Sequence, residues 1–179
     1  MISLCSYVLL NPKHHQELLD IRNQEEMIKY SQTQTIIPLD EHLIWVNTLE
    51  NNEDSLYLAV LKNDHVIGGI NANALRSKRP TWGIFFTPMT PPNITSTVAL
   101  YFLDKLFLDK HALEVQSIVH QSNDAALKFN ERIGFTCKHY ASDFCHMNLS
   151  KEQWEHKKMS KLFRPIITRM NTLITEEKL

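Results

Sequence analysis

The sequence has little glycine, little cysteine and no long hydrophobic run. Its apolar stretches are too short and too interrupted to span a bilayer, and residues 1–5 lack the basic region that begins a secretory signal. The 3 cysteines form no CxxC pair and leave one unmatched in any disulfide scheme, which fits a reducing compartment. We therefore expect a soluble cytoplasmic protein without a membrane span. Cys145 alternates with Met147 and Leu149, which favours buried packing over nucleophilic chemistry.

Charge of either sign is also not in excess. The formal net charge is -1 and the sequence pI is about 6.7, whereas proteins that bind nucleic acid normally carry a basic face or stripe. We expect no nucleic-acid partner, and we predict no metal site. With 43% hydrophobic and 22% charged residues, the chain suits one domain with a continuous core.

The first half of the chain alternates apolar runs with turn residues. Residues 2–10 are expected to form a strand, and helical spacing of apolar residues predicts helices over 14–31 and 39–50. Two further strands, 56–61 and 65–70, are joined by a short polar segment typical of a hairpin.

The second half predicts more strands and two helices. A strand over 81–86 precedes a helix over 94–108 that is apolar on nearly every side, so we expect this helix to be sandwiched deep in the domain. A strand, a short helix and two final strands follow, over residues 113–119, 123–133, 135–140 and 143–149. The order β-α-α-β-β-β-α-β-α-β-β predicts an α+β fold, with one sheet and helices on both faces, within residues 1–150.

Residues 151–179 lie beyond that predicted domain. Apolar residues at helical intervals predict one extra C-terminal helix, broken or kinked at Pro165. The helix would pack on its own domain or on a partner, as the arm of a homodimer. Glu152 and Glu155 weigh against the third option, a helix lying on a membrane surface.

The segment from Asn123 to Phe135 is the most informative part of the sequence. Asn123 suits a helix N-cap, Ala126, Phe129 and Ile133 share one face, and Gly134 suits the left-handed C-terminal position. With the apolar run before it, this segment resembles the N-x-x-A-x-x-x-Y-E-K-x-G-F signature of the GNAT superfamily of acyl-CoA-dependent N-acetyltransferases. The resemblance implies a central mixed, mostly antiparallel sheet flanked by helices, and acetyl-CoA as the acyl donor.

The resemblance also implies where the cofactor binds. A splayed strand, here residues 82–86 with Ile84, Phe85 and Phe86, would offer free main-chain groups to the pantetheine arm, and Gly83 would allow close approach. The family's glycine-rich pyrophosphate loop is eroded here, because Pro91, Ile94 and Ser96 replace its motif residues. We expect the first helical turn after it to bind pyrophosphate instead, through the amides or side chains of Asn93, Thr95, Ser96 and Thr97.

Candidate catalytic residues come partly from the same resemblance. Many GNAT enzymes have an acidic Tyr where this chain has Asn130, which cannot supply a proton but can donate a hydrogen bond to the sulfur. Asn123 would contact the pantetheine arm, cap the helix, or do both. For the general base we consider His120, at the end of a strand near the expected substrates, and alternatively Glu41 beside His42.

The amino-terminal half resembles one GNAT branch in its R-N and P-L-D-E-H motifs. That branch includes amino-sugar N-acetyltransferases of the pseudaminic acid pathway and is related to acetylases of ribosomal protein N-termini. By this resemblance Arg22 would meet a phosphate or carboxylate, although a surface ion pair is an equal reading, and Tyr30 or Trp82 would stack on a flat ring. Glu41 and His42 would line the acceptor pocket.

These observations leave three functions open. The first is an acetyl-CoA-dependent N-acetyltransferase for a primary amine of a small molecule, such as a nucleotide-linked amino sugar. The second is acetylation of a protein or peptide α-amine. The third is a non-catalytic GNAT-fold interaction module with a degenerate coenzyme A site, which the eroded loop and Asn130 favour.

Overall fold

Eight strands form a single sheet in the order β6-β7-β5-β4-β3-β2-β1-β8 in the computed structural model, which describes residues 1–177. Neighbouring strands are antiparallel except for the pairs β4–β5 and β1–β8. The strands are β1 (Ile2–Ser6), β2 (Ser55–Lys62), β3 (His65–Asn73), β4 (Thr81–Phe86), β5 (Glu114–His120), β6 (Thr136–Ala141), β7 (Phe144–Ser150) and β8 (Ile174–Glu177).

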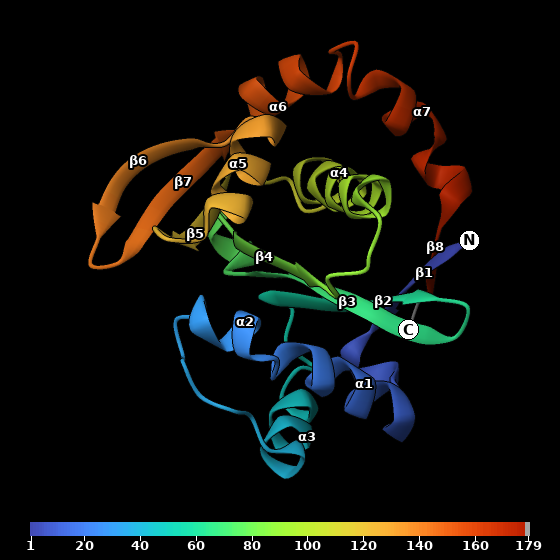
Figure 1. The fold of residues 1–179 in the computed structure, drawn as a ribbon. Helices are drawn as coiled ribbons and strands as arrows, with labels where there is room; N and C mark the ends of the chain where they lie inside the picture. The colour runs from blue at the N-terminus through green and yellow to red at the C-terminus, as the bar shows by residue number, and fades with distance from the viewer. Residues whose placement is uncertain (178–179) are drawn as a thin grey trace.

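Helices cover both faces of this sheet, as the sequence predicted (Figure 1). The N-terminal three lie on one face and the remaining four on the other. The helices are α1 (Pro12–Arg22), α2 (Glu25–Lys29), α3 (Leu39–Asn47), α4 (Pro92–Leu108), α5 (Asp124–Ile133), α6 (Lys151–Lys158) and α7 (Arg164–Leu173). Two 3-10 turns, Tyr7–Leu9 and Leu75–Ser77, complete the elements.

Helix α4 is the centre of the main core. Its residues Leu100, Phe102 and Leu106 are 0% exposed, which confirms the expectation drawn from its all-round apolar sequence. Helix α5 also follows its sequence: the Asn123 side chain accepts from the Ala126 amide, and Gly134 ends the helix with φ of 121°.

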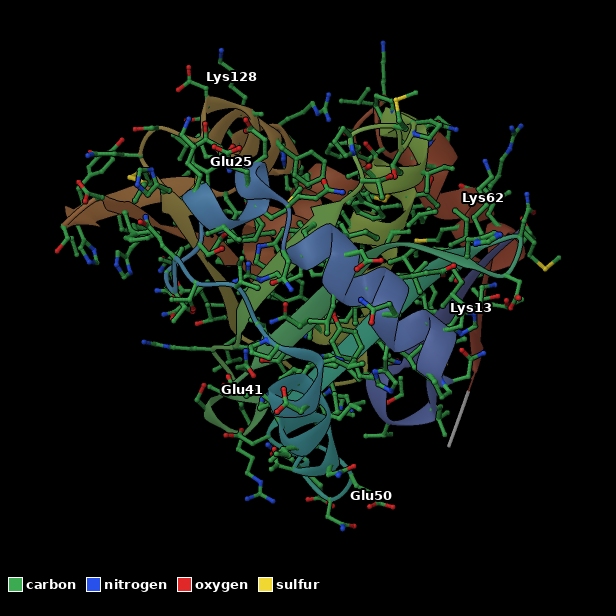
Figure 2. The ribbon with its side chains drawn as sticks, turned by 60° about the horizontal axis from the view of Figure 1, so that its bottom comes forward. Lys13, Glu25, Glu41, Glu50, Lys62 and Lys128 are labelled. Atoms are coloured by element: carbon green, nitrogen blue, oxygen red, sulfur yellow. A yellow bond between two sulfur atoms is a disulfide. The ribbon has the colours of Figure 1, made fainter. Side chains whose placement is uncertain are left out.

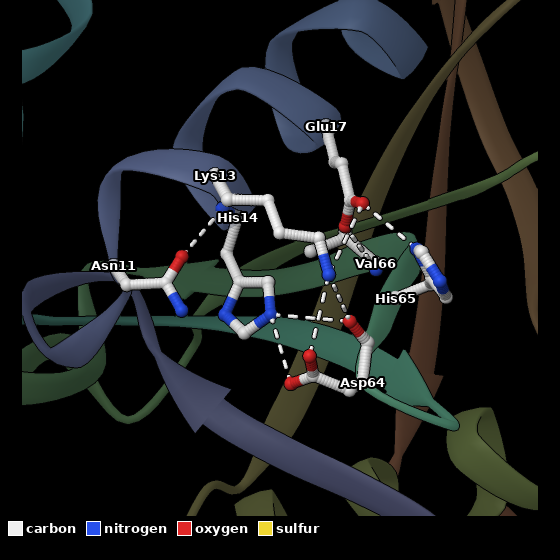
Figure 3. Close-up of polar contacts among 7 residues, drawn as sticks. All are labelled: Asn11, Lys13, His14, Glu17, Asp64, His65 and Val66. Atoms are coloured by element: carbon white, nitrogen blue, oxygen red, sulfur yellow. Dashed lines mark hydrogen bonds and ion pairs between the residues drawn. The ribbon is translucent and has the colours of Figure 1, made fainter.

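A cluster of charged side chains holds α1 against the β2–β3 hairpin (Figure 3). Lys13 Nζ lies 3.2 Å from Asp64 Oδ2, and buried His14 Nε2 lies 3.3 Å from Asp64 Oδ1. Glu17 accepts from the Val66 amide at 2.9 Å and pairs with His65 at 2.8 Å. These contacts fix α1 on the sheet, and α1 carries Arg22 at its other end.

The C-terminal residues differ from the single extra helix that the sequence predicted. Two helices, α6 and α7, are separated at residues 159–163, and the chain then adds β8 to the sheet beside β1. Trp154 is 0% exposed and its indole donates to Asp104 on α4, while Glu176 accepts from Tyr101 and Lys105. The segment therefore shares the core of the preceding sheet and helices.

The cysteines also depart from expectation. Cys137 and Cys145 are joined by a disulfide between β6 and β7, where a register shift follows Cys137. This bond departs from the interpretation of the cysteine pattern as typical of a reducing compartment, because it joins two neighbouring strands and follows no CxxC spacing. Cys145 itself is 0% exposed, as predicted.

Helices long and apolar enough to cross a bilayer are absent from residues 1–177.

Candidate active site

Strands β4 and β5 separate soon after they meet, and this split is the main feature of the site. Their pairing is limited to Thr81 with Gln116 and Trp82 with Ser117. Gln116 donates to the Pro80 carbonyl on the β5 side, whereas Thr87 donates to the Ile67 carbonyl on the β3 side. Because main-chain groups alternate along a strand, those of Ile84 and Phe86 face β5. Beyond Trp82 no strand of residues 1–177 pairs with this edge of β4. The main-chain groups of Ile84 and Phe86 are therefore available to a ligand.

A cavity of about 660 Å³ opens at this split. Strand β4 lines it with Ile84 and Phe85, β5 with the segment ending at His120, and α5 with Asn123 and Asn130. Arg22 and Tyr30 close it from the N-terminal helices. The structure thus brings eight of the predicted site residues to one cavity, namely Arg22, Tyr30, Trp82, Ile84, Phe85, His120, Asn123 and Asn130.

A second cavity of about 500 Å³ adjoins the first and shares Arg22, Asn71 and Phe85 with it. The predicted pair Glu41 and His42 lines this second cavity. Its other walls are aromatic: the ring centroids of Trp45 and Tyr57 are 4.8 Å apart, and those of Tyr7 and Tyr57 are 5.5 Å apart. Residues 1–177 therefore present two joined chambers.

Arg22 stands at the junction of the two cavities without a counter-ion. Its Nη1 is buried and has no hydrogen-bond partner within the described part of the chain, so the surface ion pair considered from the sequence is not formed. Burial lowers the pKa of Arg22, and Tyr7 partly offsets this, but a guanidinium remains charged at neutral pH. A half-buried guanidinium with an unpartnered Nη1 suits a carboxylate or phosphate ligand.

Asn130 is the other polar side chain with a buried, unpartnered atom. It is 4% exposed, its Nδ2 donates to the Ala126 carbonyl at 2.8 Å, and its Oδ1 has no partner among the described residues. The sequence-based expectation was that the Asn130 amide donates to sulfur. In the structure one of its N–H groups is bound to the helix, and the unsatisfied atom is an acceptor.

His120 lies in the first cavity between the rings of Tyr30 and Phe144, at 5.7 Å and 5.2 Å. Its Nδ1 is 3.2 Å from the Ser122 amide, which donates to it. An accepting ring nitrogen carries no proton, so the neutral ring has its proton on Nε2. This tautomer suits a hydrogen-bond donor better than a general base.

His42 is buried, and its Nε2 lies 3.0 Å from His15 Nδ1. Burial, and then the neighbouring His15, lower the pKa of His42 to about 4, so it is neutral at pH 7. Glu41, by contrast, is exposed on the rim of α3, as Figure 2 shows. It is the carboxylate that lines the second cavity.

The predicted pyrophosphate residues lie outside both cavities. Pro91 and Pro92 have no amide proton, and the Ile94 amide donates to the Pro91 carbonyl, which leaves the Asn93 amide as the free donor of the first turn of α4. The Thr97 hydroxyl is buried and donates to the Asn93 carbonyl, so it is not a phosphate ligand. Thr95 and Ser96 are half-buried in the same turn.

Two further predictions need correction. Trp82 is 4% exposed and stacks on Phe135 with ring centroids 5.4 Å apart, so packing occupies the ring face that was expected to stack on substrate. The Phe86 side chain belongs to the main core cluster, which leaves its main chain for the ligand. Gly83 accommodates the Asn71 side chain of β3, since a Cβ there would lie 2.9 Å from Asn71 Oδ1, and its approach to the cofactor arm stays a prediction.

Several residues of the second cavity were missed from the sequence. Tyr7, Trp45 and Tyr57 come from three separate elements, so no spacing connects them, and Asn71 looks like an ordinary strand residue. The aromatic composition of these segments was the available signal.

Comparisons with known proteins agree with this geometry. A family model described as an acetyltransferase (GNAT) domain matches residues 8–136. Acetyltransferase PseH of Campylobacter jejuni is 24% identical over 157 residues, covering 84% of this chain and 95% of PseH. The crystal structure of C. jejuni PseH in complex with acetyl coenzyme A has a TM-score of 0.67 at 20% identity and covers 84% of this chain and 99% of that one.

Two other solved structures share the fold at lower identity. Spermidine N-acetyltransferase from Vibrio cholerae, in complex with CoA and spermine, has a TM-score of 0.73 at 14% identity, covering 86% of this chain and 98% of that one. Apo FdhC, described as a nucleotide-linked sugar GNAT, has a TM-score of 0.71 at 15% identity, covering 87% of this chain and 91% of that one. Since the family model spans more than half of the sequence, the chain belongs to the GNAT acetyltransferase family, whose acyl donor is acetyl-CoA.

Proposed function

We propose that this protein transfers an acetyl group from acetyl-CoA to the primary amine of a small, anionic acceptor, best matched by a nucleotide-linked amino sugar. The observation that carries this proposal is Arg22, a half-buried cation at the junction of two cavities whose buried Nη1 has no partner among residues 1–177. An acceptor with a phosphate or carboxylate would satisfy it, whereas a polyamine would bring more positive charge to it.

The second cavity supports the same acceptor class. Its aromatic walls from Tyr7, Trp45 and Tyr57 suit a flat ring. A nucleotide-linked amino sugar combines a flat ring, phosphates and an amine in one molecule. FdhC, which is described as a nucleotide-linked sugar GNAT, supports this choice.

The chain's own groups fit an acetyl thioester at the β4–β5 split. Acetyl-CoA supplies the thioester; the transfer would form a carbon–nitrogen bond and break the carbon–sulfur bond, the amine would lose one proton, and coenzyme A would leave as a thiolate that gains one proton from solvent. The unpaired main-chain groups of Ile84 and Phe86 can hold the arm of the cofactor and polarise its carbonyl. Glu41 is the carboxylate we assign to take the amine proton, because it is exposed and lines the acceptor cavity.

The acceptor class can be tested by following thiol release over nucleotide-linked amino sugars, free amino sugars, polyamines and peptides. We expect turnover with the nucleotide-linked amino sugars. The Arg22→Gln variant should raise KM for these by about 10- to 100-fold, since a charged hydrogen bond contributes about 1.5–3 kcal/mol, and should leave KM for free amino sugars within about twofold. Turnover with peptides or polyamines alone would contradict the proposal.

A further inference from the structure

The β6–β7 hairpin carries a pair of sulfur atoms close to the wall of the first cavity. Cys137 on β6 and Cys145 on β7 are joined by a disulfide. Cys145 is 0% exposed, whereas Cys137 lies on the exposed edge of the sheet. Thiol–disulfide exchange needs a thiolate to reach one of the two sulfur atoms. A reductant would therefore attack this bond at Cys137.

The position of β6 depends on few contacts. The strand is at the edge of the sheet and, within residues 1–177, pairs with β7 alone (Figure 1). All 6 of its residues are exposed, and its register with β7 shifts between Cys137 and His139. Segments with little buried surface open locally at low free-energy cost. The disulfide ties this edge strand to β7, so its reduction should loosen β6.

The tip of the same hairpin supports the turn that follows β5. The Asp143 carbonyl accepts from the Gln121 amide at 2.7 Å, and Asp143 Oδ1 accepts from Gln121 Nε2 at 3.0 Å. Phe144 lies opposite His120 in the strand register, with ring centroids 5.2 Å apart. His120 lines the first cavity, and the residue after Phe144 is the buried cysteine of the disulfide. A short chain of contacts thus joins the disulfide to the cavity wall.

We propose that the Cys137–Cys145 pair is a redox modification site that sets how tightly the first cavity binds the cofactor. This inference rests on the proposed use of acetyl-CoA. In the oxidised form β6 is tied to β7, the hairpin holds the turn after β5 in place, and the cofactor binds tightly. In the reduced form the hairpin opens locally, the turn loses its support, and the cofactor binds more weakly.

A dithiol would reduce the bond in two steps. Its thiolate attacks the exposed Cys137 sulfur, forms a mixed disulfide and releases Cys145 as a thiolate, which gains a proton. The second thiol of the reductant loses its proton and attacks the reductant's own sulfur in the mixed disulfide, which releases Cys137 as a thiolate that is protonated in turn. The protein gains two electrons and two protons, and the dithiol becomes a disulfide. Glutathione disulfide reverses the change and leaves as two glutathione thiols.

Calorimetry on the oxidised and reduced full chain tests the proposal. The protein is treated with glutathione disulfide or with dithiothreitol, the reagent is removed without air, and desulfo-coenzyme A is titrated in. This probe has no thiol that could exchange with the disulfide. We expect reduction to raise Kd by about fivefold or more, the lower end of typical couplings between sites. Hydrogen exchange in β6 and in residues 120–123 should become faster on reduction.

Two variants on the edge strand separate the disulfide from other effects of the reagents. Cys137→Ser leaves the buried cysteine in place and should bind like the reduced wild type after either treatment. Lys138→Ser is the matched control, because Lys138 is exposed, is the next residue of β6 and carries no sulfur. It should keep the redox response of the wild type.

Other results would overturn the inference. Equal, measurable affinities in the two redox states would show that the disulfide is not coupled to the cavity, and so would a redox response retained by Cys137→Ser. Detection of all 3 cysteines as free thiols after treatment with glutathione disulfide would show that the pair does not form. Failure of both states to bind desulfo-coenzyme A and acetyl-CoA would reject the proposed function together with this inference, which distinguishes the two failures.

Discussion

Glu41 and His120 illustrate how local geometry separates two candidate bases that look equal in the sequence. His120 accepts from the Ser122 amide through Nδ1, so its neutral ring presents a protonated Nε2. The Glu41 carboxylate makes no comparable hydrogen bond among the described residues, and it lines the second cavity, where we propose that the acceptor binds. At the residue scale, the structure therefore favours the carboxylate.

Kinetics of two isosteric variants can check this assignment. Glu41→Gln should lower kcat by about 10²- to 10⁴-fold, the usual cost of losing a general base, whereas His120→Gln should lower it by less than about tenfold. The reverse ranking would make His120 the base.

Other residue-scale features lie beyond any sequence pattern. Arg22 and Asn130 were named as candidates from the sequence through the family resemblance, but their missing partners are a property of the folded cavity. Trp82 was expected to contact substrate, yet Phe135 covers its ring because α5 delivers that residue to the core. Which face of an aromatic ring is free depends on tertiary neighbours.

At the scale of the element, the residues that begin and end helices and turns decided which elements could be predicted from the sequence. Helix α5 follows from Asn123 and Gly134, and the β2–β3 hairpin from its polar turn, in which Asn63 and Asp64 have φ of 52° and 61°. The break between α1 and α2 was missed because it contains no Gly or Pro. It is held by Asn23, whose side chain bonds the Ile37 main chain, a contact between distant residues.

The buried pair of His15 and His42, which joins α1 to α3, makes folding stability depend on pH. Burial lowers the pKa of His42 to about 4. Burial, followed by the neighbouring His14, lowers the pKa of His15. Below about pH 6.5 the unfolded chain therefore binds more protons than the native chain, and stability falls with pH.

We expect the free energy of unfolding to decrease by about 2–3 kcal/mol as pH falls from about 6.5 to 4, measured by chemical denaturation. His42→Gln should flatten this slope, whereas the control His156→Gln, at an exposed position of α6, should keep it. Two carboxylates with lowered pKa values contribute at the acid end of this range: the Lys13 hydrogen bond lowers the pKa of Asp64, and burial of Glu17 is outweighed by the Val66 amide together with its other partners, which lower the pKa of Glu17. Both are present in His42→Gln and in the control, so the difference between the two variants reports on His42. An unchanged slope in His42→Gln would contradict the assignment.

At the scale of the whole molecule, the order of elements along the chain and the helices on both faces could be predicted because nearly every element has its own periodicity and boundaries, whereas the order of the strands within the sheet was not predicted. Strand β8 could not, since four residues are too short for a pattern and their pairing depends on the free edge of β1. The second cavity likewise arises only when α1, α3 and β2 are brought together.

Trp154 tests whether the C-terminal segment belongs to the same core. It is 0% exposed, with its ring 6.1 Å from that of Phe107 and its indole bonded to Asp104. Trp154→Ala should lower the free energy of unfolding by about 3–5 kcal/mol, whereas Met159→Ala, at a residue 63% exposed, should change it by less than about 0.5 kcal/mol. A small loss in Trp154→Ala would indicate that the segment folds separately.

The central claim is that the β4–β5 split holds acetyl-CoA although the first turn of α4 offers a single free amide. Calorimetric titration of the full chain with acetyl-CoA tests this most directly. We predict one-to-one binding with a Kd between about 1 μM and 1 mM, the range typical of enzyme substrates. No heat of binding at millimolar acetyl-CoA would contradict the account.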